Sequence, residues 1–200
     1  DYGEAIVSWE ETIGSGFEGT RKFLLDPLSD AAALIGDYPK SLDYALQLNP
    51  DLPDPDFKVT RANAHNALKY AYLLLQEEAD SARAATLLDE VLSVVEATPR
   101  LGVAGHGCRD IQALALQGKT GEALARLRQA FDEGFRGSSN YDNWSLGEDP
   151  YLESIREADE FRAVQADIQA AVDVMQRRVQ LARENGDVET ILSSTRRDRT

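Results

Sequence analysis

The sequence predicts an all-α protein, and three observations support this prediction. Apolar residues recur at steps of three and four positions in several long segments of the 200-residue chain. Sustained alternation of apolar and polar residues, the pattern of a half-buried strand, does not occur. Glycine or proline follows most of the periodic segments, at the positions where such residues end helices.

The periodic segments each place an apolar stripe along one side of a helix. The first begins at Asn63, and the last, which starts at Phe161, is the longest. Pro99 and Gly102 end the second segment, and Asn185 with Gly186 ends the last. Helices are therefore predicted over residues 63–75, 84–95, 108–115, 123–131 and 161–182.

The connections between these segments fall into two kinds. Residues 78–81 and 117–121 are short links, which force the helices on either side to be antiparallel neighbours. Residues 49–57 contain three prolines and are predicted to form an extended spacer. Residues 137–150 carry Tyr141 and Trp144, so we expect this connection to pack back onto the helices.

The acidic composition restricts the classes of partner. The chain has 21 Lys and Arg against 35 Asp and Glu, a formal net charge of −14, and such a surface repels phosphate backbones. We therefore expect no direct binding to nucleic acid. No apolar run approaches the ~20 residues of a membrane helix, so we expect no membrane insertion. A soluble protein of the cytoplasm or the periplasm agrees with both observations.

The sequence contains no convincing catalytic or metal-binding arrangement. The single cysteine, Cys108, lies two residues from His106, and a small buried cysteine at a helix start accounts for this pair. His65 is interpreted as a solvated or helix-capping residue. The segment Gly118-Lys119-Thr120 lacks the earlier glycine and the preceding strand of a phosphate-binding loop. We expect no enzymatic activity, no metal ion and no cofactor.

Several segments share a small residue followed by a bulky one after a turn. Ala123, Leu127 and Ala130 follow Gly118, residues 1–6 read Asp-Tyr-Gly-Glu-Ala-Ile, and residues 45–50 read Ala-Leu-Gln-Leu-Asn-Pro. This pattern resembles the tetratricopeptide repeat (TPR), a helix–turn–helix unit of ~34 residues. The resemblance covers roughly residues 1–136 and implies an α-solenoid of antiparallel helix pairs.

The segment after Gly134 resembles the one that closes many bacterial TPR arrays, with Trp144, an Asp149-Pro150 turn and an amphipathic final helix. The resemblance implies that residues 137–186 form a closing segment with a long C-terminal capping helix, because a terminal repeat must cover its apolar face. The expected cap contacts are Tyr151, Leu152, Ile155 and Phe161. Residues 187–200 are polar and basic, and we expect a flexible tail there.

Polar residues on two of the predicted helices form a candidate binding surface. In a TPR-like array the first helix of each pair lines the concave groove, where asparagine pairs with a peptide backbone and lysine or arginine with its carboxylates. The residues that the resemblance assigns to this surface are Asn63, Asn66, Lys69, Tyr70, Arg109 and Gln112. An ordinary solvated helix face stays open as the alternative for the same residues.

The expected function is a non-catalytic protein–protein interaction scaffold that binds a peptide or protein segment. A sensory or regulatory domain of a larger bacterial signalling or transcription-regulatory protein is the first alternative, and a helical small-ligand binder is the second. The final helix keeps a near-heptad pattern from Phe161 to Ala182, so a homodimer through this helix is also possible.

Overall fold

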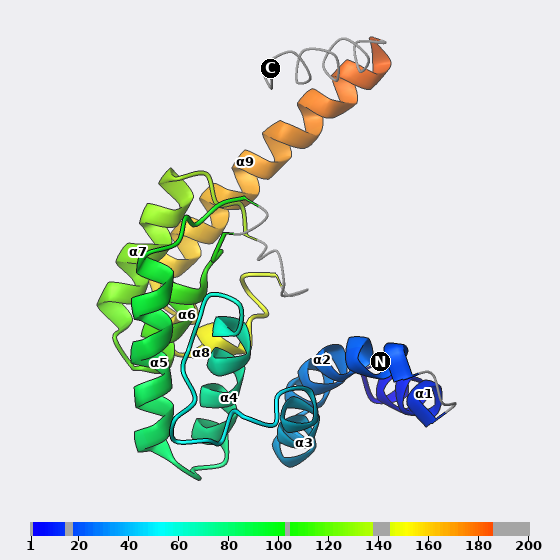
Figure 1. The fold of residues 1–200 in the computed structure, drawn as a ribbon. Helices are drawn as coiled ribbons and strands as arrows, with labels where there is room; N and C mark the ends of the chain where they lie inside the picture. The colour runs from blue at the N-terminus through cyan, green and yellow to red at the C-terminus, as the bar shows by residue number, and fades with distance from the viewer. Residues whose placement is uncertain (1, 15–17, 103–104, 138–144, 186–200) are drawn as a thin grey trace, which may run out of the picture.

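The structure is a computed structural model that describes residues 2–14, 18–102, 105–137 and 145–185. All regular secondary structure in these ranges is helical, as the sequence predicts, and they contain no strand (Figure 1). The elements in chain order are α1 Tyr2–Gly14, α2 Glu18–Leu34, α3 Tyr38–Leu48, α4 Ala64–Gln76, α5 Ser81–Glu96, α6 Arg109–Leu116, α7 Thr120–Asp132, the 3-10 turn η1 Pro150–Leu152, α8 Glu153–Arg156 and α9 Asp159–Glu184.

Neighbouring helices in the sequence are also neighbours in space. Helices α2 and α3, α4 and α5, and α6 and α7 form pairs, each joined by a short turn, and α4 also contacts α6 of the next pair (Figure 1). The prediction that residues 78–81 and 117–121 join adjacent helices is confirmed. The described helices therefore pack mainly against their neighbours in the sequence, and α4, α5 and α6 also contact one another.

One turn geometry ends the first helix of all three pairs. After α6, Gly118 has φ +72°, its amide donates to the carbonyl of Ala115 at 3.0 Å, and the amide of Lys119 donates to Leu114 at 2.9 Å. This is the Schellman arrangement, which requires a left-handed residue. Gly36 takes the same role after α2 with φ +79°. After α4 the position is occupied by Glu78, with φ +51°.

The core consists of three clusters of buried side chains. The largest centres on α4 and α5 and extends to α3 on one side and to η1 on the other. A second cluster joins α6, α7, α8 and the beginning of α9. A third holds α1 against α2 and α3. Each helix pair thus buries its apolar face against the next element, which is how a short chain of amphipathic helices gains stability.

The small residues after the turns lie at helix crossings. Ser41, Ala84 and Ala123 are each fully buried at the start of the second helix of a pair. The side chains of Ser29 on α2 and Ser41 on α3 each donate to the other residue's carbonyl, at 3.0 and 2.8 Å. At Ala123 the small side chain lets α7 pack closely against α6.

Two features of the N-terminal half differ from the sequence prediction. Helix α2 is absent from the predicted segments, and it contains Pro27, which has no amide hydrogen to donate within the helix. Residues 49–57 form successive turns rather than an extended spacer. In these turns the amide of Asp54 donates to Asp51 and that of Phe57 donates to Asp54, both at 3.0 Å, while Leu52 is fully buried.

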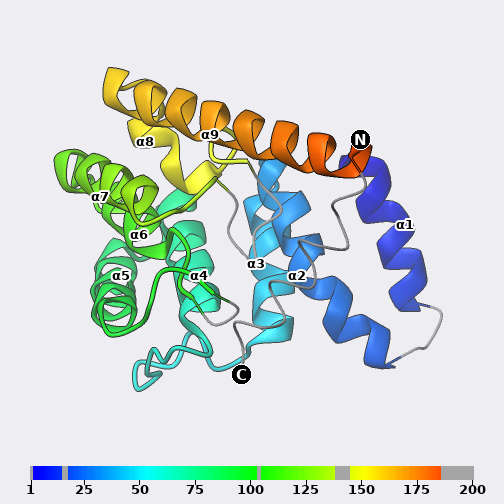
Figure 2. The same ribbon diagram turned by 90° about the horizontal axis from the view of Figure 1, so that it is seen from above.

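The C-terminal elements pack on the last helix pair. Tyr151, Leu152, Ile155 and Phe161, the expected cap contacts, are all buried. Asp149 begins η1 and accepts a hydrogen bond from the amide of Tyr151 at 2.9 Å. Helix α9 then runs past the other elements (Figures 1 and 2). Tyr141, Trp144 and the expected tail at residues 187–200 lie outside the described residues.

Candidate functional site

A cavity of about 520 Å³ lies where the beginnings of α4 and α6 meet the end of α5. Its polar side chains come from both helix beginnings and from the segments that precede them. Val94 and Val95 of α5 supply an apolar wall. The complete lining is Arg61, Ala62, Ala64, His65, Asn66, Val94, Val95, Thr98, Gly105, His106 and Arg109.

The charge of this cavity is opposite to that of the chain. Arg61 and Arg109 line it, whereas no aspartate or glutamate is among its lining residues, although the chain has a net charge of −14. The first amides of α4 and α6 add the partial positive charge of two helix N-termini. The cavity therefore combines an apolar wall with a cationic rim, which is an arrangement suited to an anionic group on an otherwise apolar segment.

The two histidines of the cavity each lie near a carboxylate outside it. His65 Nε2 is 3.8 Å from Asp26 Oδ2, and His106 Nδ1 is 3.7 Å from Asp110 Oδ1. Burial lowers the pKa of His106 below its ordinary value, although Asp110 acts in the opposite direction. The burial of His106 thus favours the neutral form of its imidazole.

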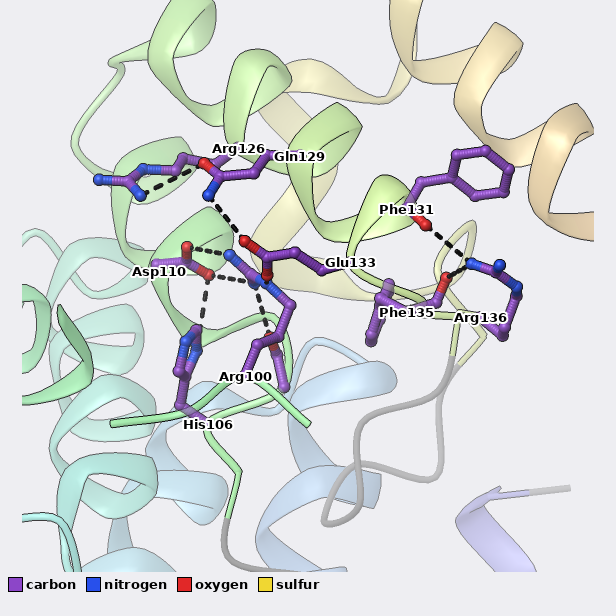
Figure 3. A network of polar contacts seen from close by, with 10 residues as sticks. Arg100, His106, Asp110, Arg126, Gln129, Phe131, Glu133, Phe135 and Arg136 are labelled. Carbon is purple, nitrogen blue, oxygen red and sulfur yellow. Dashed lines mark hydrogen bonds and ion pairs between the residues drawn. The ribbon is translucent and has the colours of Figure 1, made fainter. Parts of the chain in front are cut away.

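A buried ion-pair network holds the segment that carries His106 (Figure 3). Arg100 donates to both carboxylate oxygens of Asp110, at 2.8 and 2.7 Å, and to Glu133 at 2.8 Å. Its guanidinium also donates to the carbonyl of Gly107 at 2.8 Å. Because Arg100 binds residues of the loop, of α6 and of the end of α7, it fixes the loop against both helices.

Gly105 is required by the same loop. A Cβ atom at this position would lie 2.2 Å from the carbonyl oxygen of Arg100, closer than atoms can approach. The amide of Gly107 donates to that same carbonyl at 3.0 Å, and Gly107 has φ +63°. The loop therefore folds tightly over Arg100, and His106 projects from it between this cavity and a second one of about 700 Å³.

The predicted groove residues divide between this cavity and other places. Asn66 and Arg109 line the cavity together, although they come from different helix pairs. Asn63 instead organises the preceding loop, accepting from the amide of Thr60 at 2.6 Å and donating to the carbonyl of Lys58 at 3.1 Å. Asn66 Nδ2 also donates to Asn49 Oδ1 at 3.2 Å, which fixes its orientation.

Besides Arg109, which is buried where it lines the cavity, three of the predicted residues are buried rather than on a solvated face. Tyr70 belongs to the main core cluster. Gln112 is fully buried and donates to Asp149 Oδ2 at 2.7 Å, so it attaches η1 to α6. Lys69 is only 4% exposed. The solvated-face alternative is therefore wrong for these residues, and their side chains do not line the cavity.

Lys69 joins α4 to the first helix pair. Its Nζ lies 2.6 Å from Asp26 Oδ1 and also pairs with Asp30, both on α2. Burial would lower the pKa of Lys69, but the two carboxylates outweigh it and raise that pKa. Burial raises the pKa of Asp30, whereas for Asp26 the nearby His65 and the charge of Lys69 outweigh burial and lower it. The side chain of Lys69 therefore forms part of the contact between α2 and α4.

Arg61, His65 and His106 line the cavity but were not among the predicted groove residues. His65 is half-buried with a carboxylate nearby, which differs from the solvated role expected for it. His106 is buried with Cys108, and Cys108 is the small buried residue expected at the start of α6. The described residues contain no group of three His, Cys, Asp or Glu side chains placed to hold a metal ion.

None of the helices described here is both long and apolar enough to cross a membrane. Comparisons with protein-family models, with curated proteins and with solved structures found no match to this chain. The assignment of a function therefore depends on the geometry and charge of the cavity between α4, α5 and α6.

Proposed function

We propose that the chain is a non-catalytic, TPR-like scaffold that binds a peptide or protein segment. The bound segment places an acidic group in the cavity between α4, α5 and α6. The single observation that carries this proposal is the charge of that cavity. Arg61 and Arg109 line it without an aspartate or glutamate, in a chain that is otherwise strongly acidic.

The repeated turn supports the TPR-like part of the proposal. Three successive helix pairs share the same left-handed turn, at Gly36, Glu78 and Gly118. In each pair a buried small residue follows that turn by five or six positions. Repetition of one helix–turn–helix unit is the property that defines solenoid arrays, whose neighbouring units form extended binding surfaces.

The cavity lining indicates how such a segment would bind. The guanidinium groups of Arg61 and Arg109 pair with a carboxylate of the ligand, since arginine matches the geometry of that group. The side chain of Asn66 is placed to pair with the ligand's backbone amides or carbonyls. Val94 and Val95 accept an apolar neighbour of the acidic residue.

A binding titration tests this proposal. Fluorescein-labelled peptides of about twelve residues, matched in length and differing in acidic or basic content, are titrated with the full chain and followed by anisotropy. The expected result is saturable binding of acidic peptides with an apolar residue next to the carboxylate. Arg61→Glu, at an exposed position, is expected to weaken binding at least tenfold, about 1.4 kcal/mol.

Arg162→Glu is the matched control, because Arg162 is also exposed and lies on α9, outside the cavity lining. It makes the same change in net charge and is expected to leave the affinity unchanged. Equal weakening by both variants would show that only overall charge matters and would contradict the cavity as the site. The absence of any saturable peptide binding would contradict the scaffold function itself.

A helical small-ligand binder is the second candidate, and the cavity volume favours it. About 520 Å³ lies within the range of roughly 300–1,000 Å³ that is typical of small-molecule sites. An aliphatic or aromatic carboxylic acid fits the same lining. Stabilisation of the chain by such an acid, measured by thermal unfolding and lost in Arg61→Glu, would select this candidate if no peptide binds.

A further inference from the structure

The first turn of α4 lies at the cavity to which the proposed function assigns an acidic group. Ala64, His65 and Asn66, the first three residues of the helix, all line this cavity. The first amides of a helix have no carbonyl partner within it and need an acceptor from outside. The lining therefore combines the backbone donors of a helix start with the guanidinium groups of Arg61 and Arg109.

Asn63 stands at the capping position before α4, yet its side chain does not cap the helix. Its Oδ1 accepts instead from the amide of Thr60 at 2.6 Å, and its Nδ2 donates to the carbonyl of Lys58 at 3.1 Å. Asp37 and Asp80, at the same position before α3 and α5, do cap their helices with a side-chain oxygen. The first turn of α4 thus has capacity for an acceptor supplied by a ligand.

His106 lines the same cavity and is a buried polar side chain with an unsatisfied nitrogen. It is 7% exposed, and its Nδ1 forms no hydrogen bond within the part of the chain that the structure describes. The nearby Asp110 Oδ1 is 3.7 Å away, and Arg100 already donates to both oxygens of that carboxylate (Figure 3). Because buried polar groups are rarely left without a partner, such a side chain at a cavity indicates a polar ligand.

The carboxylates nearest the cavity are paired with cations of their own. Asp26 and Asp30 both pair with Lys69, and in the Arg100 network two carboxylates share one guanidinium. Each of these clusters has one carboxylate more than it has cations, but none of the four carboxylates belongs to the cavity lining. The two arginines of the lining are therefore nearer to a bound anion than any of these carboxylates, and their attraction dominates.

The number of donors at the cavity favours a phosphate group over a carboxylate. A carboxylate offers about four acceptor sites on two oxygens, which two guanidinium groups fill when each binds through two N–H groups. A phosphate monoester has three strongly accepting oxygens and a charge of about −1.5 to −2 at pH 7. Its third oxygen can accept from the first amides of α4 and from His106, which a carboxylate held by Arg61 and Arg109 leaves without an acceptor.

We propose that the acidic group bound in this cavity is the phosphate of a phosphorylated side chain in the bound peptide. This inference rests on the proposed function, because it names the acidic group of that same peptide. Arg61 and Arg109 pair with the phosphate oxygens, the first amides of α4 donate to one of them, and Val94 and Val95 contact an apolar neighbour. The net charge of −14 disfavours nucleic acid and anionic lipid as the source of the phosphate.

Three labelled peptides of one sequence test the proposal, with serine, glutamate or phosphoserine beside an apolar residue. Each is titrated with the full chain and followed by anisotropy, and the phosphoserine peptide is expected to bind about tenfold more tightly than the glutamate peptide, or better. Equal affinity for the two would overturn this inference and leave the scaffold function in place. Failure of all three peptides to bind would contradict the scaffold function, and this inference with it.

Competition distinguishes a phosphopeptide from other sources of phosphate. Inorganic phosphate and O-phosphoserine are expected to displace the labelled phosphopeptide only at concentrations at least about tenfold higher than the unlabelled phosphopeptide requires, because they lack the contacts of the peptide. Displacement by inorganic phosphate at the same concentration as the phosphopeptide would show that the cavity binds phosphate alone, and would overturn the peptide as the ligand.

A pair of variants and an NMR measurement locate the phosphate. Arg61→Ala is expected to weaken binding of the phosphoserine peptide about tenfold. Lys58→Ala is the matched control, because Lys58 is exposed in the same loop but outside the cavity lining, and it is expected to leave the affinity unchanged. The amide signals of His65 and Asn66 are expected to move downfield with the phosphoserine peptide, and less with the glutamate peptide. Equal weakening by both variants, or amide signals that stay in place while the phosphopeptide binds, would overturn the proposal.

Discussion

At the scale of single residues, the turn after α4 contains a backbone conformation that its side chain does not favour. Glu78 has φ +51°, the left-handed region, at the position that glycine occupies after α2 and α6. An L-residue with a Cβ atom pays roughly 1–2 kcal/mol to enter this region. Glu78 is exposed, so its replacement removes little packing.

Glu78→Gly is therefore expected to stabilise the chain by about 1 kcal/mol, since glycine adopts the left-handed conformation without strain. Urea unfolding followed by circular dichroism measures the change. Glu77→Gly is the matched control, because Glu77 is the neighbouring exposed residue with an ordinary φ of −85°. An equal gain from both variants would show that loss of a negative charge, rather than relief of the turn, is the cause.

A second prediction concerns the lysine buried between α2 and α4. Lys69→Met is expected to destabilise the chain by about 3–5 kcal/mol at pH 7, because it leaves the carboxylates of Asp26 and Asp30 without their cation. The exposed Lys58→Met is the control and is expected to change stability by less than about 0.5 kcal/mol.

The loss in Lys69→Met is expected to become smaller as the pH falls to about 4, near the ordinary pKa of aspartate. Burial already raises the pKa of Asp30 in the unchanged chain, and removal of the lysine raises it further. The native variant therefore takes up protons more readily than its unfolded state, and stability recovers toward acid pH. Urea unfolding at both pH values measures this, and an equal loss at both would contradict the electrostatic explanation.

Sequence reasoning located some residues of the candidate site and misplaced others for one physical reason. Asn66 and Arg109 line the cavity. Lys69 instead pairs with Asp26, and Gln112 donates to Asp149, both on elements far away in the chain. A polar residue on a helix looks the same in the sequence whether it meets solvent, a ligand or a buried carboxylate. The partner residues Asp26 and Asp149 belong to elements whose position the sequence alone does not give.

At the scale of the helices, the small residues at the crossings control how closely each pair packs. Ala123 is fully buried where α7 meets α6. Ala123→Leu is expected to destabilise the chain by about 1–3 kcal/mol, because the additional methylene groups have no space at the contact. Thermal unfolding measures the effect.

Ala125→Leu is the control for this substitution, because Ala125 is exposed on the same helix and leucine is a good helix former. It is expected to be close to neutral. An equally neutral Ala123→Leu would show that the contact between α6 and α7 does not require a small residue. The small residue that recurs after the turns would then have no role in helix packing.

The helices with a clear apolar period and a glycine or proline stop were predicted, whereas α2 was not. Gly118 and Gly134 end α6 and α7 as expected, with φ +72° and +104°, because glycine at these positions serves the turn directly. Helix α2 continues through Pro27, which local rules exclude from a helix interior. Its contacts with α1 and α3 stabilise it instead, and such tertiary packing cannot be read from the local sequence.

At the scale of the whole molecule, three tyrosines connect parts that are distant in the chain. The ring of Tyr72 on α4 contacts Tyr38 on α3 edge to face, with centroids 6.1 Å apart. It also contacts Tyr151 of η1 edge to face, with centroids 4.9 Å apart. Tyr72 thus links the first helix pair, the second pair and the closing segment through one buried ring.

Tyr72→Ala is expected to cost about 3–5 kcal/mol, since it removes a large buried ring and both of its aromatic contacts. The loss of stability is also expected to differ between parts of the chain. Amides of α3 and η1 lose the ring that joins them to α4, so their hydrogen exchange is expected to accelerate more than that of α7, which lies in the second core cluster. Tyr72→Phe keeps the ring and is expected to cost only about 1 kcal/mol. Exchange measured by mass spectrometry in all three chains will distinguish this linkage from a general loss of stability, in which α7 would accelerate as much as α3.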